Sequence, residues 1–272
     1  MLRPSPEWTL VLEEGRLILS GGADALYLVD EVSGAAATAL AEAFAADRLE
    51  ALDVPGLGLE RALVRLERIG AIVRARPTPA APFAVALGGT PAAIDAALVS
   101  TIALLAGDGV SIVTDGAAAL TVLVRVSGTL AELAESSARL DGPHLLVDVA
   151  QRETLVLGPL VWPGETACLS CLAGRVVRAW GDPPAPTAPR ASRAHALIAG
   201  IVVEELRRFA ALGDLPRLVE RTTAIELETW RTRSERVHRL PWCPRCFPTG
   251  PEGRAYGAGS FALPWTQGGR ST

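Results

Sequence analysis

The sequence contains no lysine, because every one of the 26 residues counted as Lys+Arg is an arginine. The missing side-chain amine excludes Schiff-base chemistry, a lysine general base and the phosphate-binding lysine of a P-loop. A high-GC genome is the simplest cause, since alanine, arginine, glycine and proline are all heavily used. The chemical exclusion holds whatever the cause.

Long apolar runs and an excess of positive charge are also missing. The longest clean apolar run, residues 96–107, falls well short of the ~20 residues that span a bilayer. A net charge of −4 disfavours nucleic acid or an anionic membrane as the main partner. Glu7, Glu13 and Glu14 interrupt any signal-like apolar core near the N-terminus. We therefore expect a cytoplasmic protein that binds neither nucleic acid nor membrane.

A length of 272 residues favours two domains, and the pattern changes at a proline-rich stretch. Residues 1–76 predict a small domain with strands at 8–12, 16–20 and 25–30, helices at 32–44 and 59–69, and a closing strand at 71–74. This order is typical of a winged-helix-like module. Residues 77–82, Pro-Thr-Pro-Ala-Ala-Pro, predict a linker, because proline lacks the amide that regular structure needs.

Residues 83–250 predict an α/β domain. Strands at 83–87, 110–115, 121–126 and 144–149 are interrupted by helices at 91–106 and 129–140. This alternation indicates an open, mostly parallel sheet of the doubly wound type. Farther along we expect strands at 154–161 and 222–230, a proline-rich loop at 183–189 and a helix at 193–212. Residues 251–272 predict an irregular tail.

Two C-x-x-C pairs use every cysteine: Cys168-Leu169-Ser170-Cys171 and Cys243-Pro244-Arg245-Cys246. Each pair presents two thiolates from a tight turn, and two such turns supply the tetrahedral set of a structural Zn²⁺. Four sulfur ligands leave no open position, so we expect an ion that pins the chain end to the second domain. Two disulfides or a thioredoxin-like redox motif are the alternatives. A cytosolic context and the repeated spacing weigh against both.

Residues 87–91, Leu-Gly-Gly-Thr-Pro, stand where a nucleotide-binding sheet has its glycine-rich turn. A working turn usually carries G-x-G-x-x-G, so that backbone amides approach phosphate. Here the third glycine is missing and Pro91 removes an amide. Asp115 ends the next strand, at the place of a ribose-binding acid, but acids at strand ends are common. We expect no nucleotide cofactor.

Catalytic groupings are missing as well. His144, His195 and His238 are isolated in the sequence and are interpreted as surface or packing residues. The acidic pairs Glu204-Glu205 and Glu226/Glu228 are typical of solvated helix and strand faces, so no catalytic residue is assigned.

The first domain offers a candidate peptide groove instead. Residues 25–30 could form an edge strand, and the helix at 59–68 would line a groove beside it. An extended peptide adds to such an edge through main-chain hydrogen bonds, while side chains in the groove select its sequence. Arg61, Arg65 and Arg68 would suit an acidic peptide. A winged helix with a solvated arginine face explains the same pattern, and the acidic net charge disfavours DNA binding by it.

These features together resemble one family. The pattern of residues 17–76, Gly158-Pro159-Leu160-Val161, residues 164–171 (Gly-Glu-Thr-Ala-Cys-Leu-Ser-Cys) and residues 241–246 (Pro-Trp-Cys-Pro-Arg-Cys) carry the resemblance. It is to the ThiF-like (ocin-ThiF-like) leader-peptide-binding proteins of thiazole/oxazole-modified microcin (TOMM) biosynthesis. In that family a peptide clamp, the RiPP recognition element, precedes a ThiF-like domain, and the partner is a YcaO cyclodehydratase.

The resemblance implies a non-catalytic subunit that binds the leader of a ribosomally made precursor and presents it to a YcaO enzyme, which forms thiazolines or oxazolines. The implied leader groove comprises Leu26, Tyr27, Leu28, Val29, Asp30, Leu59, Arg61, Ala62, Arg65 and Leu66. ThiF-like domains commonly pair, which raises a homodimer as a further partner. The alternatives are an ATP-dependent adenylating enzyme of the ThiF type, disfavoured by the missing lysine and glycine, and a winged-helix regulator with a zinc-stabilised sensor domain.

Overall fold

The computed structural model describes residues 1–22, 25–76, 83–89, 96–106, 110–113, 118–181 and 193–247. Of residues 83–89, 96 and 110–113 it describes the backbone only. The expected linker at 77–82, Asp115, the proline-rich loop at 183–189 and the tail at 251–272 lie outside these ranges. The chain divides into two compact units, Met1–Thr78 with Ala211–Asp214, and Pro79–Ala210 with Leu215–Thr272.

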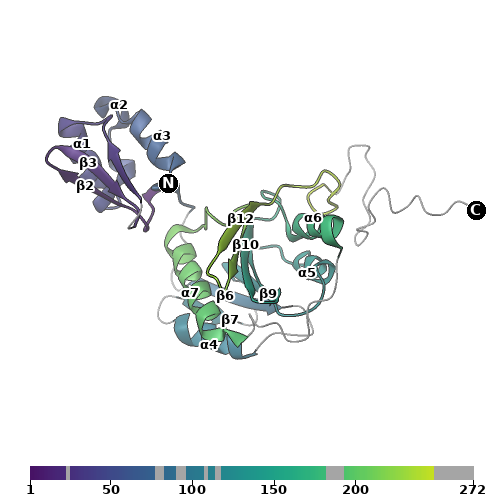
Figure 1. Ribbon diagram of the computed structural model, residues 1–272. Helices are drawn as coiled ribbons and strands as arrows, with labels where there is room; N and C mark the ends of the chain where they lie inside the picture. The colour runs from purple at the N-terminus through teal and green to yellow at the C-terminus, as the bar shows by residue number, and fades with distance from the viewer. Residues whose placement is uncertain are drawn as a thin grey trace, which may run out of the picture. The chain divides into compact units, whose positions relative to one another are not determined.

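The first unit contains two small antiparallel sheets and short helices (Figure 1). The elements in order are β1 (Leu2–Pro4), β2 (Thr9–Glu13), β3 (Arg16–Ser20), β4 (Leu26–Val29), α1 (Gly34–Ala45), the 3₁₀ turn η1 (Leu49–Ala51), α2 (Val54–Leu57), α3 (Glu60–Arg68) and β5 (Ile72–Arg74). β2, β3 and β4 pair in that order, and β1 pairs with β5. The sequence reading missed β1, η1 and α2, which are each only three or four residues long.

The core of this unit lies between one face of the β2–β3–β4 sheet and the helices. Strand alternation turns Leu17, Leu19 and Val29 inward, where they are almost fully buried. They join α1 residues such as Leu40 and the apolar stripe of α3 in one cluster. The amphipathic helix expected at 59–69 is confirmed, since Ala62, Leu63 and Leu66 are its buried residues.

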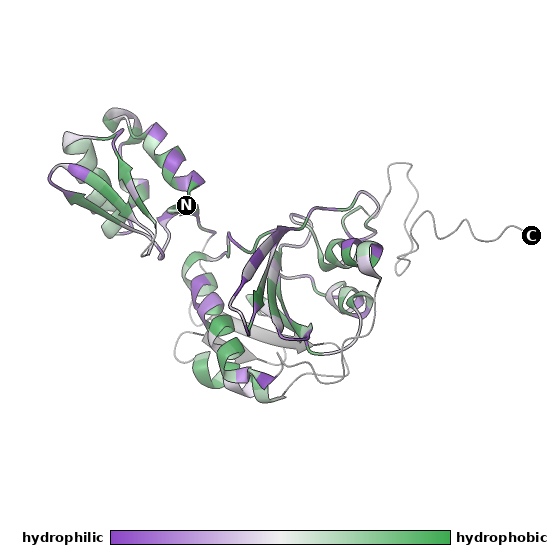
Figure 2. Cartoon of the chain, in the orientation of Figure 1, coloured by the Kyte–Doolittle hydropathy of each residue, from purple (hydrophilic) through white to green (hydrophobic). Residues whose placement is uncertain are grey.

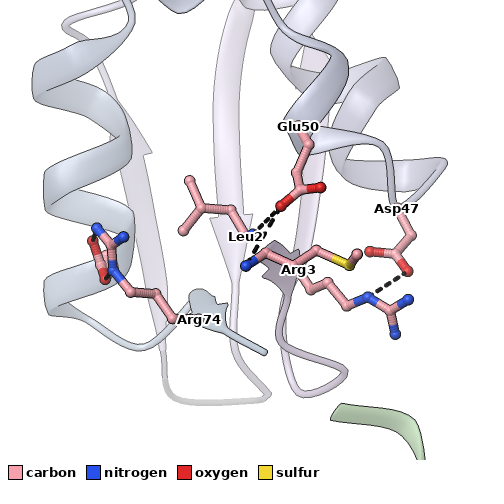
Figure 3. A network of polar contacts seen from close by, with 7 residues as sticks. Leu2, Arg3, Asp47, Glu50 and Arg74 are labelled. Carbon is pink, nitrogen blue, oxygen red and sulfur yellow. Dashed lines mark hydrogen bonds and ion pairs between the residues drawn. The ribbon is translucent and has the colours of Figure 1, made fainter. Parts of the chain in front are cut away.

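Polar contacts hold the N-terminal strand β1 in place (Figure 3). The Glu50 carboxylate accepts a hydrogen bond from the backbone N–H of Leu2 at 3.0 Å and lies 3.5 Å from the terminal amine. Arg3 Nε lies 3.7 Å from Asp47 Oδ2. On β5, the Arg74 guanidinium binds both carboxylate oxygens of Glu67, at 2.6 and 3.1 Å. These groups are largely exposed, so they orient the strands more than they stabilise them.

Within the described residues, seven strands of the second unit form one sheet in the order β12-β11-β10-β9-β8-β6-β7. They are β6 (Phe83–Gly89), β7 (Val110–Val113), β8 (Leu120–Arg125), β9 (His144–Gln151), β10 (Thr154–Val161), β11 (Arg221–Glu226) and β12 (Thr232–Arg236). β6 to β9 pair in parallel, whereas β9 to β12 pair antiparallel. The expectation of a mostly parallel sheet was therefore wrong for half of the strand pairs.

Two tight hairpins explain two of the three antiparallel strand pairs, β9–β10 and β11–β12. Arg152, with a positive φ of 41°, lies in the short turn between β9 and β10. The strand expected at 222–230 ends at Glu226, and Trp230 at φ 58° lies in the turn to β12. Neither turn contains the Gly, Asn or Asp residues that usually mark such hairpins, so the sequence carried no signal for them.

Helices cover both faces of this sheet (Figures 1 and 2). Leu120, Val122 and Val124 of β8 pack on one face with α4 (Ala96–Ala106) and α7 (His195–Leu212). Leu123 and Leu146 face the opposite side and pack with α5 (Leu130–Ser137) and α6 (Leu169–Trp180). The edge strand β12 is fully exposed and mostly hydrophilic. Among the described residues, no helix combines the length and apolar character needed to cross a bilayer.

A capping box begins α5 and gives a local test of the fold. Thr129 Oγ1 accepts a hydrogen bond from the Glu132 N–H at 3.2 Å, and the Glu132 carboxylate accepts one from the Thr129 N–H at 2.8 Å. We expect Thr129→Ala to lower the free energy of unfolding by about 1 kcal/mol in urea titration, because a helix-end donor loses its partner. Thr38→Ala, inside α1, is the matched control and should change stability by less than half of that amount. Equal effects of the two substitutions would contradict the capping assignment.

Candidate metal centre and peptide-binding edge

The four cysteines come together from two places in the second unit. Cys168 is the N-cap of α6 and Cys171 lies in its first turn. Cys243 and Cys246 lie in the turn that follows β12. The Sγ atom of Cys168 lies 3.5 Å from the Sγ atoms of Cys243 and Cys246 and 3.8 Å from that of Cys171. The Sγ atoms of Cys171 and Cys246 are 3.6 Å apart. All four sulfurs lie within 4.8 Å of one another.

This geometry fits a tetrahedral metal ion. Zinc with Zn–S bonds of ~2.3 Å places its four sulfurs ~3.8 Å apart, close to the separations found here. All four cysteines are free thiols, and even the shortest separation of 3.5 Å is far longer than the ~2.05 Å of a disulfide. Cys168, Cys171 and Cys243 are buried. A set of four sulfurs leaves no site for substrate, so a bound ion would be structural.

The four thiols affect one another unequally. Hydrogen bonds with Cys171, then with Cys243 and Cys246, lower the pKa of Cys168 well below the usual range of a thiol. Hydrogen bonds with Cys168 raise the pKa of Cys171 and of Cys246. The backbone N–H of Leu240 points at the Cys171 sulfur from 3.3 Å. Such an N–H donor stabilises a metal-bound thiolate from outside the ligand set.

The site joins the end of the described chain to the sheet. The cysteines belong to the same apolar cluster as Leu169 of α6 and Val237, which follows β12. Arg245, between the last two cysteines, donates to the Leu140 carbonyl at 3.0 Å, and Arg239 donates to the Gly164 carbonyl at 2.7 Å. A metal ion here would complete a connection that these contacts already begin.

The histidines occupy separate positions. His144 at the start of β9 is 3% exposed, and its Nδ1 lies 3.1 Å from the Gly142 carbonyl oxygen. Burial lowers the pKa of His144 and keeps the ring neutral. It is therefore a packing residue, whereas His238 is exposed and His195 lies at the first position of α7.

The expected glycine-rich turn is strand where it is described. Gly88 and Gly89 are the last residues of β6 and pair with Leu123 and Val124 of β8. Thr90 and Pro91 lie outside the described residues. Gly88 and Gly89 are therefore paired strand residues, and at these two positions the chain does not form a phosphate-binding turn.

A buried ion pair on neighbouring strands was missed by the sequence reading. Arg125 ends β8 opposite Asp148 of β9, and the two are 1% and 4% exposed. Arg125 donates to Asp148 Oδ2 at 2.7 Å and to the Gly128 carbonyl at 2.8 Å, while the Ala150 N–H donates to Asp148 Oδ1 at 2.9 Å. Burial raises the pKa of Asp148, and the charge of Arg125 opposes that shift. The signal in the sequence was a single charge inside each of two apolar strands.

The predicted groove residues of the first unit divide into two groups. Leu26, Tyr27 and Leu28 are 71%, 42% and 47% exposed on β4. Val29, Leu59, Ala62 and Leu66 are at most 4% exposed and belong to the hydrophobic core. The buried residues therefore support the edge from beneath, and their side chains cannot line a groove.

The exposed side of α3 carries a second stripe, made of Arg61, Val64, Arg65 and Arg68 at positions i, i+3, i+4 and i+7. With Glu31 and Glu60 these residues line a cavity of about 490 Å³. Arg65 binds Glu31 at 2.8 Å and lies 3.6 Å from Asp30, which ties α3 to the end of β4. Val64, 55% exposed, was not singled out from the sequence because it interrupts a row of charges.

The fold and the site define a protein class: a small mixed α/β unit with an exposed strand edge, joined to an α/β unit with a four-cysteine site. No protein-family model and no curated protein sequence matches the chain. Among solved structures it is similar to a heterocyclase in complex with substrate and cofactor, at 19% identity and a TM-score of 0.47 over 90% of this chain. It spans 39% of the length of that heterocyclase.

Two structures from E. coli are similar over nearly their whole length. MccB matches at 12% identity and a TM-score of 0.49, covering 94% of this chain and 99% of MccB. The microcin synthetase McbBCD complex with pro-MccB17 bound matches at 10% identity and a TM-score of 0.45, covering 90% of this chain and 99% of the matched chain. These are similarities of fold at low sequence identity.

Proposed function

We propose that this chain binds the leader of a ribosomally made precursor peptide and presents it to a YcaO cyclodehydratase that forms thiazolines or oxazolines. The observation that carries the proposal is the edge strand β4, whose residues Leu26, Tyr27 and Leu28 are exposed. Its end is tied to the arginine-bearing face of α3 by the contacts of Arg65 with Asp30 and Glu31. An exposed apolar strand edge invites pairing with another chain unless it is protected. Here neither proline nor lysine protects it.

Binding would proceed by strand addition. β4 ends the β2–β3–β4 sheet, and no further strand pairs with it in the described part of the chain. A leader segment that pairs with β4 gains main-chain hydrogen bonds, and every second side chain lies on the core side of the sheet. Arg61 and Arg68, which have no ion-pair partner among the described residues, would attract leader carboxylates.

The proposed role of the metal centre is structural, and Cys168, Cys171, Cys243 and Cys246 would hold a zinc ion. The proposed role of the chain is non-catalytic, because the sequence offers no lysine and no cluster of histidines to perform chemistry on a peptide. The cyclisation would then belong to the partner enzyme, as the resemblance to leader-binding proteins implies.

A second candidate function is ATP-dependent adenylation of a peptide. The observation in its favour is the strand order β7-β6-β8-β9. From β6 the chain continues to β7 on one side and then to β8 on the other side, and open α/β sheets bind ligands at such a topological switch point. Incubation of the purified chain with ATP and a precursor leader peptide, taken from any precursor gene found beside its own, distinguishes the two functions. We expect leader binding without ATP and no AMP; formation of AMP by this chain alone would favour the second function.

Leu28→Asp tests the edge. We expect at least tenfold weaker binding of the fluorescein-labelled leader in fluorescence polarisation, because the substitution places a carboxylate among exposed apolar side chains at the pairing edge. Leu104→Asp is the matched control, since Leu104 is 82% exposed on α4 of the second unit. The Leu104→Asp variant should bind the leader as tightly as the unsubstituted chain does. If the Leu28→Asp variant also binds as tightly as the unsubstituted chain, the peptide binds elsewhere.

A further inference from the structure

We infer that the β4 edge selects peptides in which apolar and acidic residues alternate. The apolar residues would lie opposite Leu26 and Leu28, and the acidic residues would point toward α3. This inference rests on the proposed function, because it names the class of leader sequence that the same edge takes.

Hydrogen bonds at the start of β4 establish which backbone groups are available. The β3–β4 register pairs Ser20 with Leu26, so Gly21 and Ala25 form the next pair, and the Gly21 N–H donates to the Ala25 carbonyl at 2.8 Å. Bonded and non-bonded pairs alternate in an antiparallel ladder. Tyr27 and Val29 therefore bond to β3, whereas Leu26 and Leu28 direct their N–H and C=O groups toward the free edge.

The outer face of the sheet requires apolar partners. Leu28 lies opposite Ile18, which lies opposite Val11, so one apolar row crosses all three strands. Leu28 and Val11 remain 47% and 44% exposed, although the core lies on the other face. An incoming residue that bonds to Leu28 has its side chain on this same outer face. An apolar residue there would extend the row and bury part of Leu28.

The inner face favours acidic partners. Incoming residues opposite Tyr27 and Val29 have their side chains on the core side of the sheet, and α3 reaches the end of β4 through Arg65, which contacts Asp30 and Glu31. Arg65 is already held by Asp30 and Glu31, but Arg61 and Arg68 have no ion-pair partner among the described residues. Both line the cavity of about 490 Å³ beside the end of β4. A carboxylate at these positions gains charge-assisted hydrogen bonds from guanidinium groups.

The two faces together impose a period of two. A strand places successive side chains on opposite faces. A peptide with its acids and its apolar residues in separate blocks therefore presents one residue type to both faces of the four-residue strand β4: leucines face the arginines, or glutamates lie beside Leu28. The same composition therefore binds well or poorly according to its order. Simple attraction between an acidic peptide and a basic surface would not distinguish the two orders.

Designed peptides test this inference. Two fluorescein-labelled nonapeptides of identical composition are compared by fluorescence polarisation, one alternating leucine with glutamate and one with the two residue types in blocks. We expect the alternating peptide to bind at least tenfold more tightly. The double variant Arg61→Glu/Arg68→Glu should bind the alternating leucine–glutamate peptide much more weakly. It should prefer a third peptide that alternates leucine with arginine. Arg231→Glu/Arg233→Glu, on exposed arginines of the second unit, makes the same charge change and should alter neither preference.

The outcomes separate this inference from the proposed function. Equal affinity for the alternating and blocked peptides, or an unchanged preference in the Arg61/Arg68 variant whose circular dichroism matches the parent, would overturn the alternation rule. If a natural precursor leader still binds in the same assay, the proposed function stands without the rule. If neither that leader nor any designed peptide binds, the proposed function itself fails, and the inference with it.

Discussion

Cys243→Ser is expected to abolish metal binding and to destabilise the second unit. Inductively coupled plasma mass spectrometry should find one zinc per chain in the purified parent protein. The variant should contain close to none, because three sulfurs leave the tetrahedral set incomplete. A structural zinc site contributes directly to folding free energy, so we also expect the melting temperature to fall by about 5–10 °C. Chelator treatment of the parent should lower it by a similar amount.

Arg245→Ala is the matched control for the metal centre. Arg245 lies between Cys243 and Cys246 and contributes one hydrogen bond, to the Leu140 carbonyl at 3.0 Å, but no ligand atom. The control should retain its zinc and melt close to the parent temperature. Parent protein that contains no zinc, or a Cys243 variant that keeps it, would refute the assignment of these four residues.

Asp148→Ala is expected to lower the free energy of unfolding by about 3–5 kcal/mol, because it leaves the Arg125 charge buried without its partner. Arg125 is 1% exposed and would retain only the Gly128 carbonyl. Its Nε atom already has no hydrogen-bond partner among the described residues. Urea titration followed by circular dichroism measures the change.

Two further variants show whether the loss comes from burial of an unpaired charge. Replacing both partners, Arg125→Leu/Asp148→Leu, should recover much of the lost stability, because two apolar side chains remove the uncompensated charge. Glu67→Gln disrupts the exposed pair with Arg74 and should leave the urea midpoint nearly unchanged. A double variant as unstable as Asp148→Ala alone would mean that the site depends on the polar contacts themselves.

The convergence of the cysteines was predictable because C-x-x-C is a local signal. Cys168 and Cys171 are three residues apart on one helical turn, and the second pair repeats that spacing, so each half of the site is formed by local geometry. What the sequence did not show is the neighbourhood of the site. Leu240 donates to Cys171, 69 residues earlier in the chain, and such long-range contacts have no sequence pattern. The zinc itself stays a prediction.

The candidate groove shows the opposite case. An apolar stripe on a helix predicts the face that packs against the core, and Ala62 and Leu66 lie there. The face available to a ligand is the other one, where Val64 stands among three arginines. Periodicity identified the helix correctly but could not distinguish a solvated charged face from one that binds a peptide.

The mixed sheet has a related explanation. Alternation of strands and helices correctly indicated the parallel half, because parallel neighbours need a crossover connection. After β9 the chain turns back at once into β10, and β11 and β12, which come after α6 and α7 in the chain, extend the sheet as antiparallel neighbours. Gly158 of β10 shows that close packing in the antiparallel half requires a particular residue. A Cβ added at this position would collide with the carbonyl oxygen of Arg221 on the adjacent strand. That requirement depends on a strand more than 60 residues away and is invisible in a local reading.

The wide spacing of the cysteine pairs has a consequence for synthesis on the ribosome. The last thiol follows the first by 78 residues, and α7, β11 and β12 are all made in between. A nascent chain therefore carries only half of the chelating set until translation reaches residue 243, and the set is complete only at residue 246. A complete metal site could therefore form only after these intervening elements have been synthesised. Chains that end early would lack the site and would remain susceptible to quality-control proteases.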